Sequence, residues 1–251
     1  MSKVGNLLKA DTPYYTLTLP LSNVKVKYRP FRVKEEKVLL LAMEDGSEGS
    51  ILIGIKNLLN QCTELEGDEG TFDAGDLPMV DMEYLFINLR AKSIGEICEP
   101  TVHCPFTDQK TTVKVDLTKI KPPKTTKIKD NRIKLSESVG VTLKNPSLNS
   151  LIESNIINYS SANPQEIICL VGSCIEDIWT EEEVYSRDNL TKEDLDEFVE
   201  SMSIKNFDEI SDYFESIPSL EHTLRYTIVN KETQEKENHQ ITLRGLNDFF
   251  V

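Results

Sequence analysis

The residues best suited to hold a metal ion are Cys98, His103 and Cys104, which fall within one short stretch of the chain. A structural zinc site takes four Cys or His ligands, commonly as two closely spaced pairs. Here His103 and Cys104 are adjacent, so on a strand their side chains would point to opposite faces, and no second pair follows. We therefore predict two half-buried strand cysteines. A zinc-binding module or a metal-dependent enzyme built on these residues is the alternative.

Motifs of other reaction centres are missing from the sequence. It contains no G-x-x-x-x-G-K-[ST] phosphate loop, no dinucleotide fingerprint after a strand and no G-x-S-x-G elbow. None of the three histidines forms an H-E-x-x-H pair, and the acidic run Glu64–Glu69 lacks the residue order of a calcium loop. We predict that the protein has no catalytic, cofactor-binding or metal-binding residues, needs no cofactor and is not an enzyme.

The composition is that of one large soluble domain or two small ones. With 251 residues the chain can bury a core without disulfides, and its five cysteines are irregularly spaced. No stretch approaches the roughly 18 apolar residues that span a bilayer, and the N-terminal residues lack the apolar core of a signal peptide. We expect a protein that is made and assembled in a cytosol, without membrane insertion.

The charge is strongly negative and unevenly distributed. A formal net charge of −14 argues against nucleic-acid binding, which requires cations that neutralise phosphates. Residues 110–134 carry nine Lys or Arg against two Asp, whereas residues 176–221 carry sixteen Asp or Glu against three Lys or Arg. This asymmetry indicates either solubility or steering between protein surfaces.

The hydrophobic periodicities predict an α+β fold of β-hairpins and about seven helices, arranged in two lobes. The first lobe, residues 1–120, holds a hairpin at 14–28, helices at 32–44, 49–62 and 79–92, and a second hairpin at 96–117. The second lobe, residues 121–251, begins at a basic linker and holds short strands at 126–143, acidic helices and a terminal hairpin. Its helices are predicted from Asn145, over 163–179, over 191–202 and from Asn206.

The helix at 32–44 has a charged first half and an apolar second half, Val38–Met43. One side of this helix must meet the core. The other side is covered either by the neighbouring hairpin and helices or by another protein. We place Leu40 and Phe86 in the core, so an aspartate at either position should unfold the N-terminal half.

Two stretches resemble motifs of a known family. YRPFRVKEEKVLLLAME at 28–44 is similar to the N-terminal signature of a baseplate-hub family of T4-like contractile-tailed bacteriophages. DMEYLFINLRAKSIGE at 81–96 resembles a second motif of that family, and LRGLNDFF at 243–250 is a weaker match. The resemblance implies a baseplate-hub component or a chaperone-like hub-assembly factor, and no catalytic residues. It also implies that other phage tail and baseplate-hub proteins are the partners, in the host cytoplasm during assembly and in the virion for a retained component.

A partner interface is predicted from apolar and acidic residues. The acidic block Glu181–Glu221, which we predict to be helical, would dock a basic partner or serve only as a solvated face. The predicted interface residues are Val38, Leu41, Glu181, Glu182, Glu183, Phe249 and Phe250.

Overall fold

The computed structural model describes residues 12–66, 71–104, 109–123, 128–154, 156, 163–229 and 236–244. The fold is α+β, as predicted, and seven α-helices lie within these residues. They are α1 (Val33–Asp45), α2 (Glu48–Cys62), α3 (Met79–Ser93), α4 (Leu148–Glu153), α5 (Pro164–Ser173), α6 (Lys192–Glu200) and α7 (Ile204–Ser216).

The strands of the described residues pair in small antiparallel sheets. One sheet has the order β1 (Tyr15–Thr18), β2 (Lys25–Tyr28), β3 (Thr63–Leu65). A second has the order β11 (Val184–Ser186), β10 (Ile175–Thr180), β9 (Val139–Leu143), β8 (Arg132–Lys134). Three strand pairs complete the set: β4 (Ile97–Cys98) with β7 (Val115–Asp116), β5 (Thr101–Cys104) with β6 (Gln109–Thr112), and β12 (Glu221–Val229) with β13 (Lys236–Arg244).

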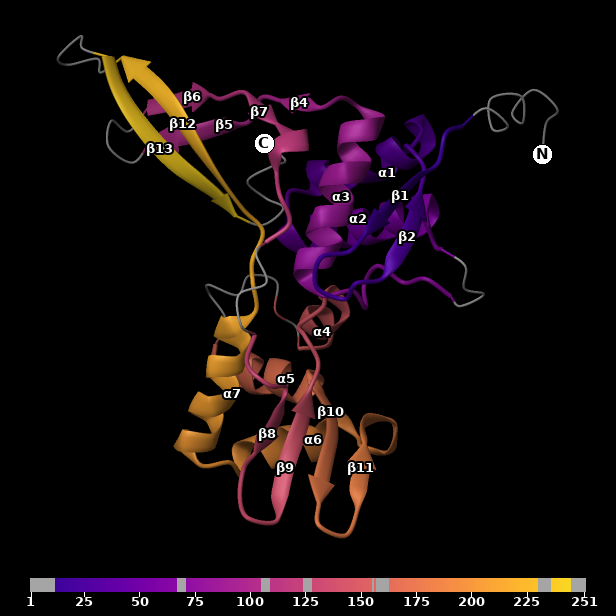
Figure 1. The fold of residues 1–251 in the computed structure, drawn as a ribbon, viewed down its shortest axis with the longest axis vertical. Helices are drawn as coiled ribbons and strands as arrows, with labels where there is room; N and C mark the ends of the chain where they lie inside the picture. Colours follow the sequence, from indigo (N-terminus) through magenta and orange to yellow (C-terminus); the bar gives the residue numbers. More distant parts are fainter. Residues whose placement is uncertain are drawn as a thin grey trace.

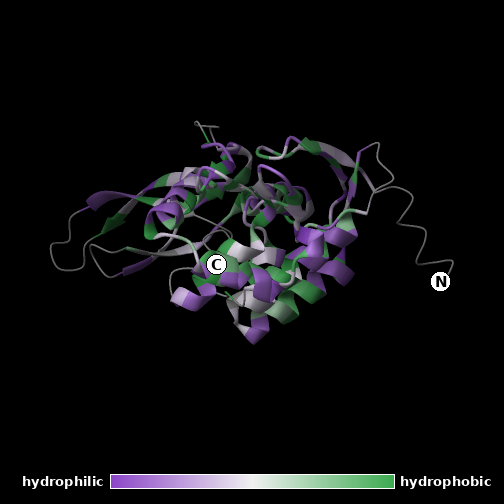
Figure 2. Cartoon of the chain, turned by 90° about the horizontal axis from the view of Figure 1, so that it is seen from below, coloured by the Kyte–Doolittle hydropathy of each residue, from purple (hydrophilic) through white to green (hydrophobic). Residues whose placement is uncertain are grey.

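These elements form two bodies joined by a narrow middle region (Figure 1). The upper body contains β1–β7, α1–α3 and the β12–β13 hairpin. The lower body contains β8–β11 and α5–α7, and α4 lies between the two. Hydrophobic and hydrophilic residues occur on the same helices (Figure 2), as expected for helices that cover a core with one side only.

The first core of the upper body lies between the β1–β2–β3 sheet and helices α1–α3. Tyr28, Ile55, Leu59 and Phe86 belong to it, which confirms the core position predicted for Phe86. Strand β3 was not expected from the sequence. This strand begins at the residue after α2 ends and pairs with β2, so no loop separates the helix from the sheet.

Helix α3 is buried on two sides. Leu85 faces the first core, whereas Val80 and Ile87 belong to a second core with residues of β4, β5 and β7. Leu224 and Tyr226 of the terminal hairpin also belong to this second core. The hairpin therefore packs with the upper body, whereas the sequence grouped it with residues 121–251; the boundary near residue 120 stays a prediction.

The lower body differs from the prediction at two elements. The predicted helix at 163–179 ends at Ser173, and the next residues form β10, whose Ile178 and Trp179 are residue types that favour strands. Helix α7 begins earlier than predicted, because the side chain of Ser203 caps it by accepting a hydrogen bond from the N–H of Asn206. Helices α5–α7 pack on β9 and β10 to form a third core.

A polar network joins the upper body to α4 at the narrow region. The Asp73 carboxylate accepts a hydrogen bond from the N–H of Gly75 at 2.8 Å, and Lys56 Nζ lies 3.2 Å from it. The side-chain amide of Asn149, in α4, donates to Asp76 at 2.7 Å, while its backbone N–H donates to the carbonyl of Gly75 at 2.9 Å. A β-carbon on Gly75 would lie 2.5 Å from Asn149 Oδ1, so a larger residue there would displace the Asn149 side chain.

Candidate functional site

Cys98 and Cys104 are buried thiols that form no disulfide. Burial raises the pKa of Cys98, which favours the protonated thiol over the thiolate that binds metals. Among the described side chains, which do not include that of His103, no three His, Cys, Asp or Glu residues gather so as to hold a metal ion. The zinc alternative therefore finds no ligand cluster in this part of the chain.

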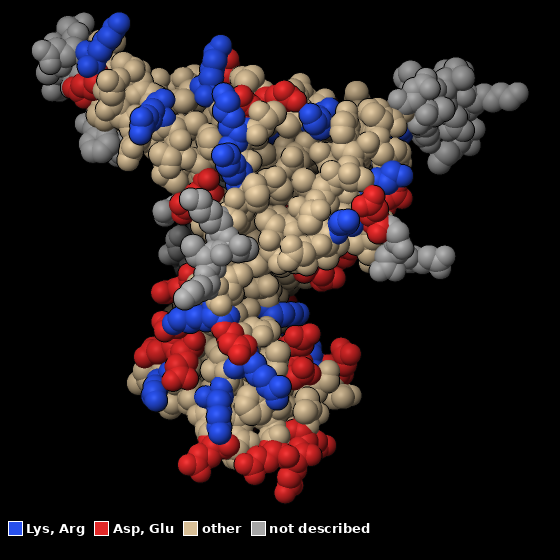
Figure 3. All heavy atoms as spheres, in the orientation of Figure 1, with Lys and Arg blue, Asp and Glu red and all other residues tan. Residues whose placement is uncertain are grey.

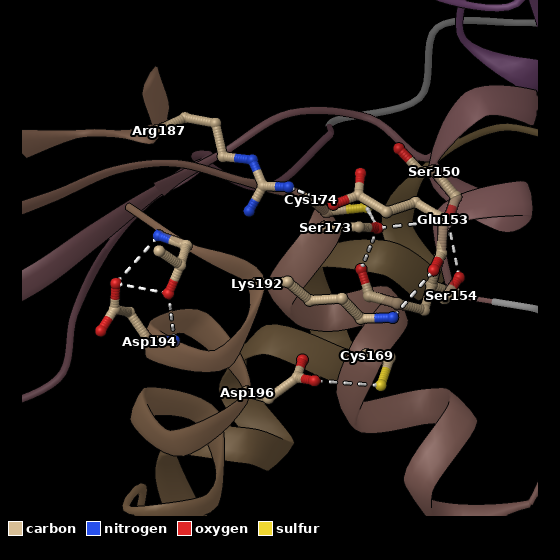
Figure 4. Close-up of polar contacts among 12 residues, drawn as sticks. Ser150, Glu153, Ser154, Cys169, Ser173, Cys174, Arg187, Lys192, Asp194 and Asp196 are labelled. Atoms are coloured by element: carbon tan, nitrogen blue, oxygen red, sulfur yellow. Dashed lines mark hydrogen bonds and ion pairs between the residues drawn. The ribbon is translucent and has the colours of Figure 1, made fainter. Parts of the chain in front are cut away.

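A group of hydroxyls and thiols lies where α4 and α5 meet (Figure 4). The hydroxyl of Ser154 donates to the carbonyl of Ser150 at 2.6 Å, and that of Ser173 donates to the carbonyl of Leu170 at 2.8 Å. Burial raises the pKa of the neighbouring Cys174 to about 11. A protonated thiol among hydroxyls bonded to backbone carbonyls is suited to packing and not to nucleophilic attack.

Charged residues at the edge of this group connect α6 and the segment before it to α4 and α5 (Figure 4). Arg187 forms an ion pair with Glu153, and Lys192 Nζ donates to the backbone carbonyl of Glu153 at 3.1 Å. The thiol of Cys169 donates to the Asp196 carboxylate at 3.4 Å. Burial and this carboxylate both raise the pKa of Cys169, which favours its protonated thiol. These charged residues, like the buried hydroxyls, hold elements of the fold together.

A contact between Arg29 and Glu35 organises the first signature stretch. Arg29 Nη2 lies 3.0 Å from Glu35 Oε1 and donates to the carbonyl of Gln61 at 2.9 Å. Glu35 Oε2 accepts a hydrogen bond from the backbone N–H of Arg32 at 2.8 Å. Burial alone would raise the pKa of Glu35, but the hydrogen bonds from Arg32 and Arg29 outweigh it and lower the pKa. The contact joins the end of β2 to the start of α1 and the end of α2.

Two residues of the second signature stretch hold the first hairpin and the first stretch in place. Asp81 is fully buried, and its carboxylate accepts hydrogen bonds from the N–H groups of Leu21 and Ser22, each at 2.8 Å. The Ser93 hydroxyl accepts a hydrogen bond from the N–H of Phe31 at 3.0 Å. The two stretches therefore form one framework that fixes the hairpin and the three helices relative to one another.

This framework orients α1 so that one side of the helix packs inward. Leu39 is buried, and α2 approaches so closely that a β-carbon on Gly54 would lie 2.9 Å from the β-carbon of Ala42. The position predicted for Leu40 is wrong, because its side chain is 54% exposed. Successive residues of a helix are rotated by about 100°, so the inward position of Leu39 turns Leu40 outward.

The other side of α1 carries large apolar side chains that remain exposed within the described part of the protein. Their exposed fractions are 80% for Val33, 38% for Val38, 54% for Leu40, 55% for Leu41 and 37% for Met43. The two apolar residues of the predicted interface, Val38 and Leu41, are in this set, which we call the α1 face. Their role in binding a partner stays a prediction.

The acidic residues of the predicted interface lie in a turn, not in a helix. Glu181, Glu182 and Glu183 connect β10 to β11 and are exposed, and the backbone N–H groups of Glu182 and Glu183 donate to the hydroxyl of Thr180. Acidic residues gather at the lower end of the lower body (Figure 3). Phe249 and Phe250 lie outside the described residues.

The sequence from residue 12 to residue 251 matches the family described as T4 bacteriophage base plate protein. The match includes both signature stretches and nearly the whole chain. The chain belongs to this family. Neither a search of curated proteins nor a search of solved structures found a match.

The framework built from Arg29, Glu35, Asp81 and Ser93 is therefore the framework of a phage base plate protein. Both stretches could be found from the sequence, whereas these contacts could not; an acidic residue among the apolar residues that open α3 was the available signal for Asp81. No helix in the described residues of this base plate protein is long and apolar enough to cross a membrane.

Proposed function

We propose that this base plate protein is a baseplate-hub component or a chaperone-like hub-assembly factor that acts through protein–protein contacts and not through catalysis. Its partners are other tail and baseplate-hub proteins of the same phage, which it meets in the host cytoplasm during assembly. Membership of the base plate family supports a place in this assembly. The protonated buried thiols support a role without covalent chemistry.

The exposed α1 face is the observation that carries this proposal. Apolar side chains that are close together on a surface mark sites of protein association. The face is rigidly presented, because Arg29 and Glu35 fix the first turn of α1 and Leu39 anchors its middle. A rigid apolar surface loses little conformational entropy on binding, which favours its use as a docking site.

The acidic turn is the second surface that we assign to partner binding. Its three consecutive glutamates lie at the end of the lower body, far along the molecule from α1 (Figures 1 and 3). Charges at such a tip steer a basic partner and increase the rate of association more than the affinity.

The proposal is tested by co-expressing the protein with the hub proteins of its phage and measuring complex formation by gel filtration. Leu40→Asp and Leu41→Asp should abolish the complex and leave the melting temperature unchanged, because both side chains are more than half exposed. Val229→Asp, at an exposed position (45%) at the end of β12 and outside both proposed surfaces, is the matched control and should bind normally. If both α1 variants still form the complex, the α1 face is not the docking site.

Reversal of the charges at Glu181, Glu182 and Glu183 tests the acidic turn separately. The triple lysine variant should fold normally and associate more slowly at low salt, with a difference that shrinks as the salt concentration rises. An association rate equal to that of the wild type would make the turn a solvated surface. Mass spectrometry of mature particles then distinguishes a retained hub component from an assembly factor that leaves.

A further inference from the structure

An apolar hollow lies on the lower body, away from the α1 face. It has a volume of about 350 Å³, at the small end of the range of ligand-binding pockets. Its apolar lining comes from three helices: Ile167 and Ile168 of α5, Val199 of α6, and Ile204 and Phe207 of α7, with Met202 between the last two helices.

Val199, Ile168, Met202 and Phe207 belong to or pack against the third core, but Ile204 does not. Ile204 is 83% exposed, although it is a large apolar residue at the first position of α7. Its place is set by the Ser203 cap, which fixes the start of the helix beside the hollow. Met202 adds a flexible apolar side chain, a residue type that adapts to different bound shapes.

The charges around the hollow are almost all negative. Helices α5–α7 carry ten Asp or Glu and only two lysines, Lys192 and Lys205. Glu200 lines the hollow itself. Lys205 lies 3.8 Å from Glu209, and Lys192 donates to the carbonyl of Glu153, so both cations already have partners. This potential disfavours nucleic acid and anionic lipid as occupants and favours a cationic one.

We infer that the hollow is a second docking site, and that its occupant is a segment of a partner protein with a few apolar side chains flanked by Lys or Arg. The apolar side chains enter the space between Ile168, Met202 and Phe207. The flanking cations lie over the acidic residues of α6 and α7, including Glu200. This binding mode is that of an amphipathic helix or short peptide in a groove. The inference does not require the α1 face, so one molecule can hold two partners at opposite ends.

The test uses the full-length protein and overlapping peptides of about 15 residues, roughly four helical turns, from the baseplate proteins of the same phage. Binding is measured by fluorescence anisotropy at low and high salt. Peptides that bind should combine apolar and basic residues. Ile204→Asp and Glu200→Lys should each weaken their binding by about tenfold or more, with the effect of Glu200→Lys lost at high salt.

Control variants keep the inference separate from the proposed function. Val184→Asp places the same new charge elsewhere on the lower body, and Leu40→Asp alters only the α1 face; both should bind these peptides normally. Unchanged melting of Ile204→Asp, expected from its exposure, excludes unfolding as the cause. Peptide binding that Ile204→Asp leaves intact would overturn the inference. So would selection of acidic peptides, or a wild-type dimer in sedimentation that Ile204→Asp dissociates, since the occupant would then be a second copy of the chain.

Discussion

Replacing Asp81 tests whether the second signature stretch holds the first hairpin. The carboxylate is fully buried and accepts two backbone N–H groups from residues about sixty positions earlier in the chain. Asp81→Ala removes both acceptors, and a buried donor without a partner costs about 1–3 kcal/mol. Ser22 is exposed, so water can replace the carboxylate at its N–H, whereas Leu21 is partly buried. We therefore expect a loss of roughly 2–4 kcal/mol in the free energy of unfolding.

The assay is thermal and urea unfolding, combined with hydrogen exchange over the first hairpin. For a chain of this size each kcal/mol lowers Tm by about 2–4 °C, so Asp81→Ala should melt roughly 4–16 °C lower. Asp81→Asn keeps the shape but retains one acceptor oxygen, and its loss should be about half as large. Exchange at Leu21 and Ser22 should accelerate in both variants.

Lys92→Ala is the matched control on the same helix. It removes an exposed ion pair with Glu96, which contributes only about 0.3–0.5 kcal/mol. If Asp81→Ala and Asp81→Asn both unfold within about 0.5 kcal/mol of Lys92→Ala, the carboxylate does not hold the turn, and the framework derived from the two stretches is wrong.

The pKa shifts give three further predictions. The pKa of Glu35 is lowered, and that of Asp73 is lowered to about 2. Both carboxylates therefore stabilise the fold above about pH 4, and this stability is lost as the pH falls toward 2. Urea unfolding at several pH values between about 2 and 5 measures this loss. Burial raises the pKa of Glu83 to about 8, so its contribution to stability falls as the pH rises from about 4 to 8, and Glu83→Gln should abolish that decline. Burial also raises the pKa of Cys62 and Cys174 to about 11, so neither thiol should react with a disulfide reagent at pH 8 until guanidinium unfolds the protein; rapid labelling of either in the folded protein would refute their placement.

Local periodicity predicted the elements whose apolar residues show one clear phase. The terminal strands were found because the alternating residues of β12 point to one face. The spacing of Leu85 and Leu89 revealed α3, but the burial of its opposite side was not predicted. Helix α1 was predicted as an element, but its orientation was not. Three consecutive leucines, 39–41, contain no phase information, and the inward position one turn earlier is occupied by Glu35, a charged residue. Because Glu35 is charged, although it is buried and paired with Arg29, the sequence shows no apolar residue one turn before Leu39 and so does not indicate which leucine is in the core.

The remaining errors concern contacts between distant parts of the chain. Ile175 and Ile178 continue the helical spacing of Val171 and Cys174, so only their pairing with β9 reveals a strand. The place of Leu224 in the second core is likewise not predictable from a local pattern, because the chain passes through the whole lower body before it returns. The hollow beside Ile204 needs three helices to converge, so it could not be predicted from any one of them.

The return of the terminal hairpin to the upper body makes the lower body an insertion within another folding unit. Residues that complete the second core, from Leu220 to Leu243, leave the ribosome only after the whole lower body has been synthesised. A nascent chain can therefore fold the lower body first, while the second core still lacks the residues of β12 and β13. During translation the apolar surface of the second core therefore stays exposed, and able to aggregate, until β12 and β13 have been synthesised and pack on it.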